Sequence, residues 1–94
     1  MIEYYVYIMT NYRNTVLYTG VTNDLRRRAD EHKMGLSLDS FTKRYHIYKV
    51  VYFATFPTTE EAIAYEKTIK GWRRIKKASL IEKENPEWED LLTE

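Results

Sequence analysis

The chain has 94 residues, enough for one domain near the lower size at which a hydrophobic core folds without disulfides or metals. Hydrophobic residues make up 44% of it and aromatic residues 15%, which indicates a globular core, and the absence of cysteine excludes disulfides and thiolate metal sites. No apolar run approaches the ~20 residues that cross a bilayer, and the first residues lack a signal-peptide pattern. We therefore expect one cytoplasmic domain over residues 1–94 with no membrane segment.

The net charge of +1 argues poorly for a nucleic-acid binder, but the charges are unevenly distributed. Acidic residues gather at the C-terminal end, at Glu82, Glu84, Glu87, Glu89, Asp90 and Glu94. Basic residues dominate the middle, at Arg26, Arg27, Arg28, Lys33, Lys43, Arg44, Lys49, Lys67, Lys70, Arg73, Arg74, Lys76 and Lys77. A tail folded away from the basic surface would leave a local positive field for phosphate, whereas solvated helix faces explain the same charges more simply.

The first part of the chain predicts a β-hairpin. Residues 3–9 and 15–21 are rich in aromatic and β-branched side chains, which favour strands, and residues 11–14 between them have the composition of a turn. A helix should follow, because Leu25, Ala29 and His32 recur at helical spacing. We expect it to be capped by Thr22 or Asn23, to have Asp24 at its positive end, and to stop near Gly35.

The second part predicts a polar loop over residues 36–44 and a third strand over 45–55. Thr58 followed by Glu61 has the spacing of a capping box and should open a second helix that ends near Arg74. The apolar stripe of that helix consists of Ala62, Tyr65, Ile69 and Trp72. A short third helix around residues 78–81 and a packed tail with Trp88, Leu91 and Leu92 should follow, separated by Asn85-Pro86.

Arg28 and His32 lie four residues apart on the predicted first helix. If Leu25 and Ala29 face the core, Arg28 and His32 point along its edge. A partly desolvated arginine needs an anionic partner, either a protein carboxylate or a substrate phosphate. Pairing with a glutamate, or extension of the charged group into water, is the simpler explanation of this pattern alone.

Glu66 lies at the margin of the apolar stripe on the predicted second helix. An acid in that place is a metal ligand, an ion-pair partner or an outward residue on a broad face. One carboxylate is a weak signal beside the clusters that mark most metal sites. Octahedral Mg²⁺ nonetheless tolerates a single protein carboxylate if water and phosphate supply the other ligands.

Two tyrosine motifs end the predicted strands of the hairpin, Tyr5-Val6-Tyr7 and Tyr18-Thr19-Gly20. Two phenols that converge with a guanidinium and an imidazole suggest chemistry on phosphate. A phenol beside a metal and an arginine loses its proton more readily and can activate water. Either tyrosine alone is more simply a strand aromatic, since the chain contains nine tyrosines.

Together, these residues resemble the GIY-YIG nuclease superfamily. The first tripeptide of the superfamily appears as Tyr5-Val6-Tyr7 and the second as Tyr18-Thr19-Gly20, and the further positions correspond to Arg28, His32 and Glu66. The small, single-domain bacterial branch of YhbQ-like (UPF0213-type) proteins is the most similar, on Tyr18 to Thr22, Phe41-Thr42-Lys43 and Glu66 to Trp72. The resemblance extends from about Tyr4 to Trp88.

The resemblance implies an α+β fold with a small three-stranded antiparallel sheet flanked by helices. It also implies metal-dependent hydrolysis of phosphodiester bonds, as in homing endonucleases, restriction enzymes and the bacterial excision-repair nuclease UvrC. We therefore expect a nuclease that acts on nucleic acid, on DNA rather than RNA, with structure-selective cleavage linked to repair. One divalent ion, Mg²⁺ or Mn²⁺, is the implied cofactor.

The resemblance also assigns roles to individual residues. It implies that Tyr7 and Tyr18 line the site, that Arg28 stabilises the phosphate, that His32 assists proton transfer and that Glu66 holds the divalent ion. Either tyrosine can be the base or can position the water. Tyr5 stands where glycine is usual and Thr19 where isoleucine is typical, so Tyr5 is expected to narrow the site. The asparagine of the family is matched loosely by Asn85, which a turn before Pro86 explains equally well.

Two other functions remain open at this point. A noncatalytic nucleic-acid-binding module would use phosphate contacts from Lys43, Arg44, Lys70, Arg73 and Arg74, with salt-sensitive binding and little sequence preference. A protein-interaction module would dock its acidic tail and Trp88 on a partner. Trp72 and Trp88 are equally well explained as core aromatics.

Overall fold

The structure is a computed structural model that describes residues 2–35 and 44–92. The described residues form the strands β1 (Tyr4–Thr10), β2 (Leu17–Thr22) and β3 (Lys49–Phe56) and the helices α1 (Leu25–Lys33), α3 (Thr59–Lys70) and α4 (Arg74–Glu82). The predicted loop over 36–44, including Lys43, lies outside the described residues except for Arg44. No helix within the described ranges combines the length and apolar character that crossing a membrane requires.

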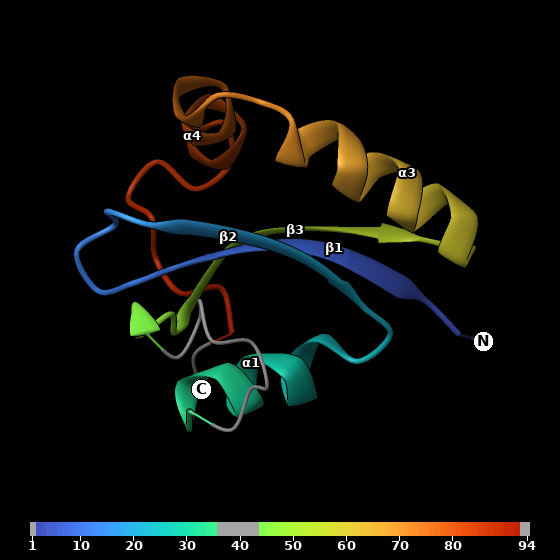
Figure 1. The fold of residues 1–94 in the computed structure, drawn as a ribbon, viewed down its shortest axis with the longest axis horizontal. Helices are drawn as coiled ribbons and strands as arrows, with labels where there is room; N and C mark the ends of the chain where they lie inside the picture. The colour runs from blue at the N-terminus through green and yellow to red at the C-terminus, as the bar shows by residue number, and fades with distance from the viewer. Residues whose placement is uncertain (1, 36–43, 93–94) are drawn as a thin grey trace.

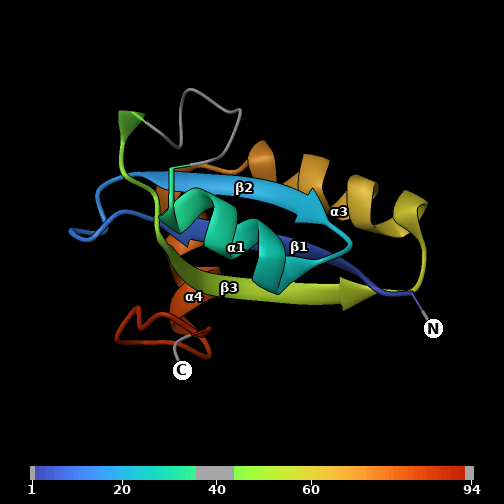
Figure 2. The same cartoon turned by 90° about the horizontal axis from the view of Figure 1, so that it is seen from below.

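The three strands form one antiparallel sheet in the order β2-β1-β3, which confirms the predicted architecture. β1 and β2 form the predicted hairpin, in which Tyr7 lies opposite Gly20, and β3 pairs with the other side of β1, with Phe53 opposite Tyr7. Figures 1 and 2 show α1 against one face of the sheet and α3 and α4 against the other. Strand β1 is therefore central, and β2 is an edge strand.

Alternate residues of β1 point to opposite faces of the sheet, as the two-residue period of a strand requires. Val6 and Ile8 belong to the core on the α3 side, which also contains Val51, Ala62, Ile69, Ile81 and Trp88. Tyr7 and Met9 belong to the core on the α1 side, with Leu25, Ala29, Ile47 and Val50. Each face of the small sheet is thus covered by its own hydrophobic cluster.

The helix starts are determined by short polar side chains. Asp24 is the N-cap of α1 and its carboxylate accepts a hydrogen bond from the Arg27 backbone N–H at 3.1 Å, so the predicted cap at Thr22 or Asn23 is wrong by one or two positions. Thr22 lies two residues earlier, where its hydroxyl accepts from the Asp24 N–H at 3.1 Å. Thr58 caps α3 and accepts from the Glu61 N–H at 3.2 Å, as the capping box predicts.

Three predicted boundaries differ from the structure. Helix α3 ends at Lys70 with Gly71 as its C-cap, and not near Arg74, because the extended backbone of Arg73 starts α4. Helix α4 is consequently longer than the short helix predicted around residues 78–81. Strand β3 starts at Lys49 and not at 45, and His46, just before it, has a left-handed backbone with φ of 55°.

The C-terminal tail packs on the molecule along the outer edge of β3. The buried Asn85 side chain donates to the carbonyls of Val51 at 3.0 Å and Glu89 at 2.9 Å, which gives it a structural position in the turn. The Leu91 N–H donates to the Val50 carbonyl at 2.8 Å. Trp88 is only 8% exposed, so it is a core aromatic and not a projecting anchor for a protein partner.

Candidate active site

Tyr7 is fully buried on the central strand, and its ring lies directly above the backbone of Gly20 on β2. A Cβ atom built on Gly20 would lie 2.4 Å from the Tyr7 hydroxyl oxygen and 2.6 Å from Cζ. No side chain larger than hydrogen fits there without displacing the ring. The glycine of the second motif is therefore required by the tyrosine of the first.

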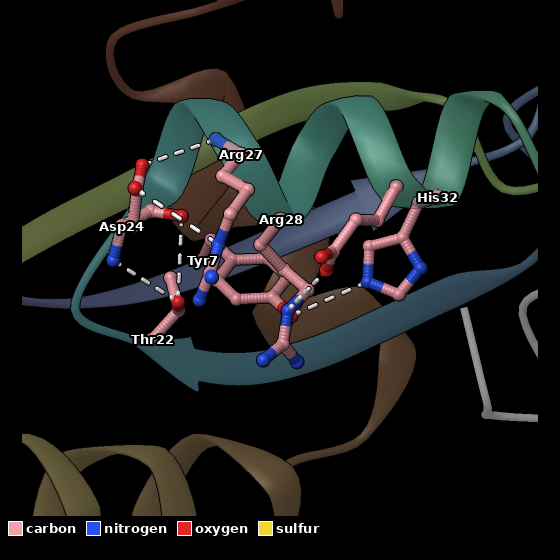
Figure 3. A network of polar contacts seen from close by, with 7 residues as sticks. Tyr7, Thr22, Asp24, Arg27, Arg28 and His32 are labelled. Carbon is pink, nitrogen blue, oxygen red and sulfur yellow. Dashed lines mark hydrogen bonds and ion pairs between the residues drawn. The ribbon is translucent and has the colours of Figure 1, made fainter. Parts of the chain in front are cut away.

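The Tyr7 ring, Tyr18 and His32 form a compact group, which we call the ring cluster. The Tyr7 hydroxyl lies 3.4 Å from His32 Nε2, within hydrogen-bond distance (Figure 3). The ring centroids of Tyr18 and His32 are 5.4 Å apart, and Tyr7 lies 6.3 Å from Tyr18 and 6.2 Å from His32. Strand β1, strand β2 and the last turn of α1 each contribute one ring.

Arg28 lies one helical turn before His32, so both project from the same side of α1 (Figure 3). Its Nε atom is 3.2 Å from the Glu31 carboxylate, and both side chains are 37% exposed. Ion pairs open to solvent contribute little to stability. Arg28 can therefore exchange Glu31 for another anion, such as a phosphate, at small free-energy cost.

The members of this group differ in how far they reach solvent. Tyr7 is completely enclosed, whereas Tyr18 and Arg28 are half-buried. Tyr18 and Arg28 are therefore partly accessible to solvent. The Tyr7 hydroxyl lies beneath them, in contact with His32.

Tyr5 does not lie over the ring cluster, although it faces the same side of the sheet. Its ring packs edge-on against Phe53, with centroids 6.3 Å apart, and its hydroxyl donates to Glu3 at 3.3 Å. Burial, followed by the Glu3 carboxylate, raises the pKa of Tyr5, which favours the neutral phenol. Tyr5 lines two hollows beside Asn23 and Asp24, of about 490 and 350 Å³. The space that Tyr5 narrows is therefore in these hollows, nearer the start of β1 than Tyr7.

Glu66 is buried on α3, on the opposite side of the sheet from the ring cluster. Its Oε2 atom lies 2.7 Å from Nζ of Lys70, one turn later on the helix. In Figure 2, α3 runs along the β2 side of the sheet. The structure thus brings Tyr7, Tyr18, Arg28 and His32 together and separates Glu66 from them by the edge strand β2.

The basic residues predicted to contact nucleic acid fall into separate groups. Lys70 pairs with Glu66. Arg74 donates to the backbone carbonyls of Asn14 and Thr15 and lies 5.9 Å from the Trp88 ring, so it ties the hairpin to α4. Arg73 and Arg44 are exposed, and the Arg44 guanidinium lies 5.5 Å from the Tyr45 ring.

Comparison with known proteins relates this geometry to a family. Residues 3–79 match the model of the GIY-YIG catalytic domain. The chain belongs to the GIY-YIG family. The match contains both strands of the hairpin, α1, β3 and α3, and therefore all the side chains of the ring cluster together with Arg28 and Glu66.

Relatives of similar size are UPF0213 proteins. One from Haloquadratum walsbyi is 37% identical over 84% of this chain and 86% of its own length, and one from Oceanobacillus iheyensis is 36% identical over 85% and 91%. The solution NMR structure of the UPF0213 protein BH0048 from Bacillus halodurans is 30% identical and superimposes with a TM-score of 0.58 over 99% of this chain and all of its own. The resemblance to this branch of the GIY-YIG family is confirmed.

GIY-YIG nucleases generally use a divalent metal ion, so the oxygen donors of this chain can be tested for their fit. Within residues 2–35 and 44–92, no three His, Cys, Asp or Glu side chains form a metal-binding group. Glu66 offers one buried carboxylate, and the Thr19 hydroxyl, on the α3 side of β2, is buried and lacks a hydrogen-bond partner among the described residues. These donors fit a hydrated Mg²⁺ or Mn²⁺ that substrate phosphate completes, and not a protein cage.

Sequence reasoning allowed for an ion pair at Arg28 and at Glu66 but did not name the partners, and it missed the buried hydroxyl of Thr19. Glu31 pairs with Arg28 at a spacing of three residues and Lys70 with Glu66 at a spacing of four, and both spacings are visible in the sequence as helix-surface pairs. The partnerless hydroxyl of Thr19 carries no comparable signal, because its burial depends on how α3 packs on β2.

Proposed function

We propose that this chain is a divalent-metal-dependent endonuclease that hydrolyses phosphodiester bonds, with DNA as its preferred substrate. The observation that carries the proposal is the contact of the Tyr7 hydroxyl with His32 Nε2, above a glycine that leaves room for it, with Arg28 on the same side of α1. Phenol, imidazole and guanidinium are the groups needed to move a proton and to hold a phosphate.

Arg28 binds the phosphate in this mechanism. Its planar guanidinium can form paired hydrogen bonds to two nonbridging oxygens and stabilises the charge that develops there. The solvent-open pair with Glu31 keeps the guanidinium oriented before substrate arrives. Release from Glu31 costs little, because exposed ion pairs are weak.

The ring cluster positions the attacking water and accepts its proton. Tyr18 is half-buried beside His32 and positions the attacking water, and His32 accepts the proton that this water releases, while its hydrogen bond with Tyr7 holds the imidazole in place. Imidazole is suited to this step because its charge changes near neutral pH. Tyr7, which is enclosed, orients His32 from below.

Glu66 would hold the divalent ion, and the buried Thr19 hydroxyl, on the same α3 side of the sheet, is a second oxygen donor. When bound, such an ion polarises a phosphoryl oxygen and stabilises the leaving alkoxide. In the structure the Lys70 ammonium, with Nζ 2.7 Å from Glu66 Oε2, is the partner of this carboxylate. Cleavage therefore requires residues from both faces of the sheet to act across the edge of β2.

The test is a panel of labelled DNA and RNA, as single strands, duplexes, nicked and branched forms, incubated with Mg²⁺ or Mn²⁺. The wild-type chain should cut DNA, and Glu66→Gln and Arg28→Ala should each lose cutting. Matched controls on the same helices are Glu60→Gln and Arg27→Ala, which alter exposed side chains and should keep activity. Unchanged activity in both site variants would refute the assignment.

A noncatalytic nucleic-acid-binding module is the second candidate. The 2.7 Å pair between Lys70 and Glu66 favours it, because an ammonium already neutralises the carboxylate that would hold the ion. Phosphate contacts would then come from Lys43, Arg44, Lys70, Arg73 and Arg74. Salt-sensitive binding without turnover in either divalent ion would identify this function.

A further inference from the structure

The turn that joins β1 to β2 carries a strongly exposed aromatic ring. Tyr12 is 76% exposed, and its ring stacks on Tyr48, with centroids 6.4 Å apart and planes inclined by only 14°. Tyr48 is half-buried, and its backbone N–H donates to the Thr10 carbonyl at 3.0 Å. Protein covers one side of the Tyr12 ring, while the residue as a whole remains open to solvent.

Hydrogen bonds within the turn, and others from α4, hold the turn that carries Tyr12 in place. Asn11 Oδ1 accepts from the Thr15 N–H at 2.8 Å, and Asn11 Nδ2 donates to the Thr15 hydroxyl at 2.7 Å. Arg74 adds hydrogen bonds from α4 to the carbonyls of Asn14 and Thr15. A ring on such a turn is already oriented, so a ligand that stacks on it loses less free energy to ordering.

The two chain segments that carry Tyr12 and Tyr48 have basic and no acidic side chains. The two segments that meet here, residues 10–18 and 44–52, contain no aspartate or glutamate. Arg13 and Arg44 are exposed on them, and the Arg44 guanidinium lies 5.5 Å from the Tyr45 ring. Figures 1 and 2 both show the β1–β2 turn and the start of the 44–48 segment at the same end of the sheet. We call this surface the hairpin patch: Tyr12, Arg13, Arg44, Tyr45 and Tyr48.

Stacked rings beside arginines match the chemistry of unpaired nucleotides. A duplex buries the faces of its bases, whereas a single strand offers them to aromatic side chains while its phosphates pair with cations. Tyr12 follows Tyr7 by five positions, a span of at most about 17 Å. A strand stacked on Tyr12 therefore reaches the ring cluster within a few nucleotides.

We propose that the hairpin patch binds unpaired nucleotides beside the site of cleavage, with one base stacked on Tyr12. The inference rests on the proposed function only in taking nucleic acid as the ligand. It makes the substrate a nucleic acid with a single-stranded segment next to the scissile bond.

The test measures binding separately from cleavage, by fluorescence anisotropy in EDTA with a short labelled DNA strand, the RNA of the same sequence, and the DNA duplex. Tyr12→Ala should weaken single-strand binding by about 5- to 150-fold and leave duplex binding nearly unchanged. Tyr12→Phe should bind like the wild type, because stacking needs the ring and not the hydroxyl. Ile75→Ala, at a residue 78% exposed on α4, is the control for the loss of an exposed apolar side chain.

Single-strand binding that is unchanged in Tyr12→Ala, or lost equally for single strand and duplex, would overturn the proposal. If Tyr12→Ala weakens binding of the DNA and RNA strands equally, base stacking is the only requirement for binding at the patch. A larger loss for one of them identifies that nucleic acid as the natural ligand. Single-strand binding that depends on Tyr12, without cleavage in any divalent ion, would refute the proposed nuclease activity and support nucleotide binding at the hairpin patch. Cleavage that is unaffected by Tyr12→Ala, with unchanged binding, would refute the patch alone.

Discussion

The two faces of the sheet use neighbouring residues of the same strand for different purposes. On the α3 face, Val6 and Ile8 are packed in a core of aliphatic and aromatic side chains. On the α1 face, Tyr7 lies between them in sequence, equally buried, but its hydroxyl contacts His32 and its ring requires Gly20. On β1, therefore, the neighbours of Tyr7 contribute apolar burial on the α3 face, whereas Tyr7 brings a hydrogen-bonded hydroxyl to the α1 face.

Strand β2 connects the two faces. Gly20 faces α1 and accommodates Tyr7, whereas its neighbour Thr19 faces α3 and has a buried hydroxyl that lacks a partner among the described residues. Glu66 is the buried acid of the α3 face. A polar group on the otherwise apolar face is best explained by function, because burial without a full set of partners costs stability.

The largest expected effect is on stability, from the α3 face. Ile69 is fully buried, so Ile69→Ala should lower the free energy of unfolding by about 2–5 kcal/mol in urea denaturation, through lost burial and a residual cavity. Ile75→Ala removes the same atoms from an exposed position and should stay within about 0.5 kcal/mol. Similar losses in the two variants would contradict the burial of Ile69 in the core of the α3 face.

The next effect is on activity, from the α1 face. Tyr7→Phe removes only the hydroxyl that contacts His32, and cleavage should fall by at least about 100-fold. The free energy of unfolding should change by only about 0.5–1.5 kcal/mol, the net value of one hydrogen bond. Tyr4→Phe, on the α3 side of the same strand, should leave the cleavage rate unchanged. A rate that falls equally in both variants would show that the faces are not functionally distinct.

Gly20→Ala tests the close approach between the two tyrosine motifs. The new methyl group would collide with the Tyr7 hydroxyl, which should cost about 1–3 kcal/mol of stability and displace the ring from His32. At Gly71 the nearest atom to an added Cβ is 3.5 Å away, so Gly71→Ala should be tolerated and gain about 0.4–1 kcal/mol. Thermal or urea unfolding measures the stability of both variants. A Gly20→Ala variant as stable as the wild type would contradict the observed packing of Tyr7 on Gly20.

The smallest effect is a loss of stability at alkaline pH. Burial, then the hydrogen bond with Tyr65 at 2.8 Å, raise the pKa of Tyr52. Above about pH 10 the unfolded chain loses this proton while the folded chain keeps it, so stability is present below that pH and declines as the pH rises. Because Tyr52 is partly exposed, the contribution should be below about 1 kcal/mol.

Urea unfolding between neutral and alkaline pH measures this effect. The decline should be shallower in Tyr52→Phe than in the wild type. Tyr12→Phe, which alters an exposed ring, should reproduce the wild-type slope. A wild-type slope in Tyr52→Phe would exclude Tyr52 as the group responsible.

Much of the fold followed from local patterns in the sequence. The hairpin and the capping box at Thr58 depend on residues close together in the chain, so they were predictable. The end of α3 was not, because Trp72 continues the apolar stripe of the helix even though Gly71 terminates it. The packing of Asn85 and Asp90 on β3 was equally inaccessible, because it joins residues about forty positions apart.

The sequence predicted which residues belong to the candidate site, but it did not predict how all of them are placed relative to one another. Tyr7, Gly20 and His32 were placed together by motif and helical spacing, and their contacts agree with that expectation. The pairing of Tyr5 with Phe53 depends on the β1–β3 register, which no local pattern specifies. The position of Glu66 across β2 depends on which face α3 covers.

The central claim is that groups from both faces act together at the edge of β2. Its most direct test is NMR of the isotope-labelled chain titrated with Mn²⁺, which broadens the amide signals of residues near the bound ion. We predict broadening that is strongest at Thr19, Gly20 and Glu66 and that disappears in Glu66→Gln, while the variant stays folded. Broadening confined to the acidic residues of the tail, or an identical pattern in Glu66→Gln, would contradict the account.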